Sequence, residues 1–118
     1  MADFRRGDVV KVPFPYTDRA TRQSRPALVA STGSLEETHG LLCVVMITSA
    51  ENRGWPGDVD VSNLAAAGLP VASVIRTAKV ATIEAGDATR LGKVSAATLK
   101  RVAQRIGEIV GLATSQNS

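Results

Sequence analysis

The sequence predicts a mainly β protein with helices (α+β), built as a small β-barrel with one amphipathic helix packed on it. Several short segments are rich in β-branched residues and are separated by polar or turn residues. Near the C-terminus, apolar residues recur at the intervals of an α-helix over several turns. A chain of 118 residues has room for a single core. We therefore expect one domain over residues 1–112, followed by a polar tail at 113–118.

Five segments have the composition of strands. The first is expected over residues 7–14, where prolines at 13 and 15 should bend or end it, and the second over residues 25–30. Residues 41–47 are apolar on both faces and should be buried on both. Residues 58–61 alternate as a half-buried strand does, and residues 73–83 are again β-branched.

The connections are polar, and helices are expected in two places. Residues 17–24 form a basic loop, residues 33–40 are interpreted as a hairpin connection, and residues 50–57 are rich in turn formers. Ser62 or Asn63 can cap a helical turn over residues 64–67. Ser95 can cap the main helix. The apolar stripe of that helix consists of Leu99, Val102, Ala103, Ile106, Ile109 and Val110.

Composition narrows the classes of function. The chain has 14 Lys and Arg against 11 Asp and Glu, a net charge of +3, which permits an anionic partner without requiring one. The single cysteine, Cys43, excludes an intrachain disulfide and is interpreted as a small core residue. The first residues lack an apolar signal region, and no apolar run reaches membrane-spanning length, so we expect a cytoplasmic protein without membrane contact.

The common catalytic templates do not fit the sequence. His39, the single histidine, lies in a polar segment and is interpreted as a surface residue, which disfavours histidine-based catalysis. The spacings of zinc-protease, phosphate-loop and dinucleotide-binding motifs do not occur. Asp58 and Asp60 would share one strand face as a possible metal pair, but solvent-facing charges explain them better. No metal or cofactor is expected.

An arginine and a threonine at strand ends remain as candidates. Arg25 precedes a proline, which restricts its backbone, and guanidinium is a planar fork that suits phosphate oxygens. Thr48 ends the strongest strand and could hold a hydroxyl nearby. Two such groups could cleave RNA, which carries its own nucleophile in the 2′-hydroxyl. On spacing alone the structural interpretation is favoured, in which Arg25 pairs with an acid and Thr48 merely ends a strand.

Five segments in order resemble the MazF/PemK family of toxins from type II toxin–antitoxin systems. They are residues 7–18 (GDVVKVPFPYTD), 24–31 (SRPALVAS), 45–49 (VMITS), 68–77 (GLP, then SVIRT) and 91–95 (LGKVS). No single segment is decisive, but their order over nearly the whole chain is strongly specific.

The resemblance implies an SH3-like barrel of the MazF/PemK/CcdB type, a homodimer, and a cognate antitoxin with an acidic segment. It implies metal-independent, sequence-selective cleavage of single-stranded RNA (an mRNA interferase), with 2′,3′-cyclic phosphate and 5′-hydroxyl products. Arg25 would stabilise the phosphorane-like transition state, and Thr48 would bind the scissile phosphate or orient the 2′-hydroxyl. The residues expected to bind RNA are Tyr16, Thr17, Arg19, Arg22, Ser49 and Arg76, the last of which could instead serve the dimer.

Two alternatives stay open. A CcdB-like toxin shares the barrel but poisons DNA gyrase, and that function would depend on the C-terminal helix. A catalytically silent homologue would retain antitoxin binding alone. Arg25 and Thr48 at the family's positions favour the nuclease over the gyrase poison.

Overall fold

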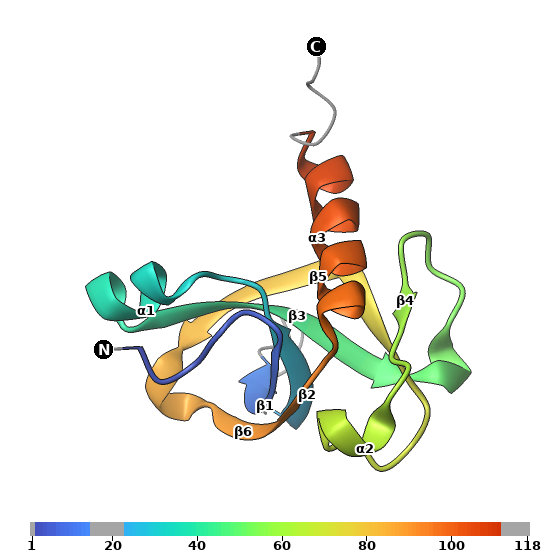
Figure 1. Ribbon diagram of the computed structural model, residues 1–118, viewed down its shortest axis with the longest axis horizontal. Helices are drawn as coiled ribbons and strands as arrows, with labels where there is room; N and C mark the ends of the chain where they lie inside the picture. Colours follow the sequence, from blue (N-terminus) through green and yellow to red (C-terminus); the bar gives the residue numbers. More distant parts are fainter. Residues whose placement is uncertain (1, 15–22, 112–118) are drawn as a thin grey trace.

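A computed structural model of the protein describes residues 2–14 and 23–111. Its centre is an antiparallel sheet in the order β4-β5-β3-β2-β1-β6, which curls into a half-barrel (Figure 1). The strands are β1 (Asp8–Phe14), β2 (Gln23–Val29), β3 (Leu41–Ser49), β4 (Val59–Asp60), β5 (Ser73–Glu84) and β6 (Thr89–Lys93). The predicted mainly β class with a terminal helix is confirmed. The tail expected at 113–118 lies outside the described residues.

The sheet is buried on both faces because successive residues of its central strands enter different cores. Val9, Leu28 and Val45 belong to one cluster, which also contains Val102 of the C-terminal helix. Their neighbours along the strands, among them Val10 and Val44, belong to a second cluster. The side-chain alternation of a β-strand explains this division. The expectation that the segment at 41–47 is buried on both faces is therefore confirmed.

Strand β5 changes direction partway along its length. Its register with β3 shifts between the pairs Val45↔Val80 and Ile47↔Ile75, so extra residues of β5 stand opposite a short stretch of β3. Such an irregularity bends a strand and re-aims its side chains. Arg76 lies in this irregular stretch.

The C-terminal helix α3 (Ala96–Val110) begins as predicted, with the Ser95 side chain accepting a hydrogen bond from the Thr98 N–H at 3.1 Å. Its first turns pack on the sheet, and Val102 is buried. The end of the apolar stripe does not pack on the sheet, since Ile109 and Val110 are 54% and 58% exposed. Figure 1 shows why, because the last turns of α3 extend beyond the sheet.

Two further elements differ from the prediction. Residues 33–40, interpreted as a hairpin connection, contain the helix α1 (Gly33–His39), which ends at the left-handed Gly40. The helix buries no residue, so it has no apolar stripe to reveal it. It is tied to the N-terminal segment instead, because Glu36 accepts hydrogen bonds from the N–H groups of Asp3 and Phe4 at 2.9 and 3.0 Å. Strand β6 was not predicted, and it pairs with β1 at one edge of the sheet.

A short helix joins the two sheet edges. Helix α2 (Leu64–Ala67) is the predicted helical turn, and its Asn63 cap accepts a hydrogen bond from the Ala66 N–H at 3.0 Å. It follows β4 along the chain and lies against Gly92 of β6, where a Cβ would stand 2.3 Å from the Ala66 carbonyl oxygen. In the described part of the chain, no helix is long and apolar enough to cross a membrane.

Candidate active site

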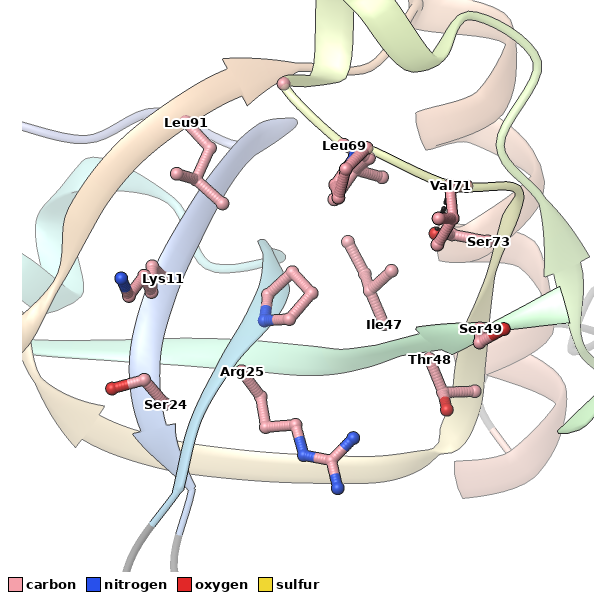
Figure 2. A pocket seen from close by; sticks show the side chains of 13 residues that line it. Lys11, Ser24, Arg25, Ile47, Thr48, Ser49, Leu69, Val71, Ser73 and Leu91 are labelled. Atoms are coloured by element: carbon pink, nitrogen blue, oxygen red, sulfur yellow. Dashed lines mark hydrogen bonds between the residues drawn. The ribbon is translucent and has the colours of Figure 1, made fainter. Parts of the chain in front are cut away.

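A pocket of about 360 Å³ opens between the ends of β2 and β3 and the segment that follows α2 (Figure 2). Its volume is in the range of ligand-binding clefts. Its lining consists of Lys11, Ser24, Arg25, Pro26, Ile47, Thr48, Ser49, Gly68, Leu69, Pro70, Val71, Ser73 and Leu91. These residues include two cations and no carboxylate, so the pocket favours an anion with an apolar portion.

Arg25 and Thr48 line the same pocket from neighbouring strands. Strands β2 and β3 are paired up to Ala27↔Met46, and Arg25 and Thr48 each lie two residues beyond that pair. Figure 2 shows the guanidinium of Arg25 extending toward the end of the pocket where Thr48 lies. Ser49, also predicted as a site residue, lines the same end.

Thr48 is a buried residue whose hydroxyl is hydrogen-bonded to Asn52. The residue is 6% exposed, although it lines the pocket. Its Oγ1 accepts a hydrogen bond from Nδ2 of Asn52 at 3.1 Å. Asn52 stands close enough because the chain turns sharply after β3 into the short helix η1 (Ala50–Asn52). Ser49 caps this turn by accepting a hydrogen bond from the Glu51 N–H at 3.3 Å.

Arg76 does not line the pocket that contains Arg25 and Thr48. Its Nε and Nη2 donate to the two carboxylate oxygens of Asp58 at 3.2 and 3.0 Å, and Nη2 also donates to the Asn52 carbonyl. The guanidinium lies 4.3 Å from the ring centre of Trp55. Both side chains of the Arg76–Asp58 pair are buried. The interpretation of Asp58 as a solvent-facing charge is therefore wrong, whereas Asp60 is exposed as expected.

The family model described as PemK-like, MazF-like toxin of type II toxin–antitoxin system matches residues 5–110. The chain belongs to this toxin family. The resemblance inferred from five short segments is thereby confirmed. No curated protein sequence matches the chain.

Solved structures share the fold of this MazF-like chain. MazF from Deinococcus radiodurans superposes with a TM-score of 0.76 at 23% identity, covering 92% of this chain and 96% of the other. A MazE–MazF structure from the same organism gives 0.73 at 23% identity, with 93% and 97% covered. An endoribonuclease in complex with its cognate antitoxin from a mycobacterial species gives 0.74 at 19% identity, with 92% and 96% covered.

The other residues considered in the sequence of this MazF-like chain do not belong to the described pocket lining. Tyr16, Thr17, Arg19 and Arg22 lie outside the described residues. His39 ends α1, is exposed, and does not line the pocket. In the described ranges, no three His, Cys, Asp or Glu side chains gather closely enough to hold a metal ion.

Cys43 is half-buried on β3, not a core residue as expected. Burial raises the pKa of its thiol above the ordinary value.

Sequence reasoning missed Asn52. The residue stands in a polar turn of the MazF-like chain, where an asparagine is ordinarily explained by turn formation. A weak signal was present, since Asn52 is four residues after Thr48 and follows a possible Ser49 cap. A compact turn after Thr48 brings Asn52 back toward the Thr48 side chain.

Proposed function

We propose that this chain is the toxin of a type II toxin–antitoxin system and a metal-independent endoribonuclease that cleaves single-stranded RNA at selected sequences. One observation carries the proposal: Arg25 and Thr48 line the same end of one pocket. Among its described lining residues the pocket also has Lys11 and no carboxylate, a charge that suits an RNA phosphate. The fold relatives known as MazF and as an endoribonuclease add support.

The proposed chemistry is a transesterification within the RNA. The 2′-oxygen forms a bond to the phosphorus and loses its proton, while the bond from phosphorus to the 5′-oxygen breaks and that oxygen gains a proton. The products are a 2′,3′-cyclic phosphate and a 5′-hydroxyl. Arg25 stabilises the extra negative charge of the phosphorane-like transition state and assists proton transfer to the leaving oxygen. Thr48 donates its hydroxyl proton to a phosphate oxygen, and Ser49 contacts the RNA beside it.

A cognate antitoxin and a homodimer complete the proposal. MazF relatives occur with MazE, and a mycobacterial endoribonuclease occurs with its antitoxin. An acidic antitoxin segment would compete with RNA for the cations of the pocket. Exposed apolar side chains at Val71 and at the end of α3 are compatible with a dimer. Val74 is buried and cannot contribute to such a surface.

The test incubates purified, antitoxin-free protein with a long single-stranded RNA in excess EDTA. We expect cuts at a few discrete sites, and a loss of about 100-fold or more in rate for Arg25→Ala, as when an oxyanion-binding group is removed. Arg101→Ala is the matched control, because Arg101 is exposed on α3 and lies outside the pocket. Thr48→Val removes a hydroxyl at nearly constant volume, with exposed Thr38→Val as its control.

Each outcome assigns the chain to one class. Cutting that survives EDTA and is lost in Arg25→Ala supports the nuclease. Cutting abolished by EDTA would contradict metal-independent chemistry. Absence of cutting in all RNAs tested would exclude the nuclease, and a gyrase-cleavage assay would then separate a CcdB-like poison from a silent antitoxin-binding homologue.

A further inference from the structure

A chain of polar contacts, buried at Arg76 and Asp58 and exposed at Asn52, leads from β5 to the hydroxyl of Thr48. Asp58 accepts two hydrogen bonds from Arg76, Arg76 donates to the backbone carbonyl of Asn52, and Asn52 donates through its side chain to Thr48. The side chains of Arg76 and Asp58 are 8% and 9% exposed, so water competes little for them. Contacts of this kind are stronger, and more costly to break, than those at the surface.

Arg76 fixes the loop after β3 at several points. The loop contributes the Asn52 carbonyl, the Trp55 ring and the Asp58 carboxylate, and all three contact the same guanidinium. The bend of β5 at the register shift is where Arg76 stands. The planar fork of a guanidinium can bind several partners at fixed angles, which an ammonium group cannot do. The place of Asn52 is therefore set by a side chain on a different strand.

The contact with Asn52 also determines what the Thr48 hydroxyl can do. A threonine hydroxyl has one proton to donate and two lone pairs that accept. Nδ2 of Asn52 donates to Oγ1, so it occupies a lone pair and leaves the proton available. The proton then has to turn away from Asn52, and Thr48 is a lining residue of the pocket. Thr48 is thereby prepared to donate toward a ligand in the pocket.

We propose that Asn52, held by Arg76, is a positioning residue that directs the Thr48 hydroxyl proton toward the RNA phosphate. The proposal rests on the proposed function and deepens it. It assigns Arg76 to the network behind Thr48, where its charge is engaged by Asp58, instead of to direct contact with RNA. Asn52 acts through Thr48, so its importance depends on that hydroxyl being present.

A double-mutant cycle tests this dependence. The rate of single-turnover cleavage is measured for wild type, Asn52→Ala, Thr48→Val and the double variant. We expect Asn52→Ala to slow cleavage by about 3- to 10-fold, the value of one hydrogen bond. In the Thr48→Val background the same change should alter the rate by less than about twofold, as coupled residues do. Affinity for an RNA with a 2′-deoxy group at the cut site should stay nearly constant.

A second substitution reverses the hydrogen bond instead of deleting it. Asn52→Asp keeps the shape of the side chain but replaces the amide by a carboxylate, which only accepts hydrogen bonds. The Thr48 hydroxyl would then donate its proton to the carboxylate at position 52, and no longer to the substrate. We expect a larger loss of rate than for Asn52→Ala. Arg53→Ala is the matched control, because it changes the charge by the same amount at the next, exposed residue.

The possible outcomes separate the two proposals. Equal losses from Asn52→Ala with and without the Thr48 hydroxyl would overturn the positioning role, as would Asn52→Asp being no worse than Arg53→Ala. Urea unfolding of each variant shows whether a lost rate reflects lost folding. A wild-type protein that leaves RNA intact would overturn the proposed function and the positioning role together. That case is recognised because the parent protein itself fails.

Discussion

Replacing Arg76 by methionine should destabilise the protein strongly, because it leaves the Asp58 carboxylate buried without its partner. The substitution keeps much of the side-chain volume and removes the charge. It deletes two hydrogen bonds to Asp58 and one to the Asn52 carbonyl. The Asp58 side chain is 9% exposed, so its unpaired carboxylate would not be fully hydrated unless the loop moved.

The magnitude follows from this burial. Removing one partner of a buried pair costs about 3–5 kcal/mol, which is a large share of the roughly 5–15 kcal/mol that stabilises a domain. With a urea m-value of about 2 kcal/mol/M, the unfolding midpoint should fall by about 2 M. The assay is urea unfolding followed by circular dichroism, with m compared between variants.

Arg53→Met is the matched control for the loss of an arginine. Arg53 pairs with Asp60 at 3.5 Å, but the two side chains are 60% and 70% exposed, so this loss should cost less than about 1 kcal/mol. The double variant Arg76→Met, Asp58→Leu removes the abandoned charge and should recover part of the stability. If Arg76→Met costs no more than the control, or if the double variant is less stable than the single one, the reasoning is refuted.

Three further changes test local features of the fold. Gly92→Ala places a Cβ 2.3 Å from the Ala66 carbonyl oxygen and should lower the free energy of unfolding by about 1–3 kcal/mol, measured by thermal unfolding. Gly86→Ala is the control, because a Cβ there meets open space. Equal effects of the two substitutions would contradict the close packing of α2 on β6. Ser95→Ala should cost about 1 kcal/mol by removing the N-cap of α3, and an unchanged unfolding midpoint would argue against the cap. Burial raises the pKa of the Cys43 thiol, so native protein should react with iodoacetamide more slowly at pH 8 than urea-unfolded protein. Because the thiol holds its proton more tightly in the folded state, its contribution to stability is present below the ordinary thiol pKa and is lost as the pH rises through the raised pKa of the folded state. Faster reaction of the native protein with iodoacetamide would refute the raised pKa.

The elements that could be predicted from sequence are those that bury one side in a regular pattern. The β-branched run at 41–47 and the stripe of α3 are examples, since their apolar spacing reflects contact with the core. Helix α1 and strand β6 lack this pattern. Helix α1 buries no residue and is held by Glu36, while β6 is mostly exposed and is held by pairing with β1. Interactions with distant segments decide such elements, and a local pattern cannot show them.

The same distinction explains the candidate site. Arg25 and Thr48 could be proposed from their strand-end positions and from the family resemblance, and the two residues line one pocket from neighbouring strands. The partner of Asp58 could not be predicted, because Arg76 is 18 residues away and reaches it through the bend of β5. Asp60, two residues after Asp58, is exposed, although strand alternation predicts the same face for both residues.

Arg25 and Arg76 show why residue type alone does not identify a phosphate-binding group. Each arginine stands on a strand and each was a candidate for RNA contact. Arg76 pairs with the buried carboxylate of Asp58, so its charge is compensated inside the protein. Arg25 lines the pocket that also contains Thr48, and under the proposed function a phosphate bound there would contact its guanidinium. Electrostatic stabilisation of a transition state depends on such a pre-arranged charge next to the reacting group. Under the two proposals above, Arg25 acts on the phosphate in the pocket, whereas Arg76 holds the loop that positions Asn52 beside Thr48.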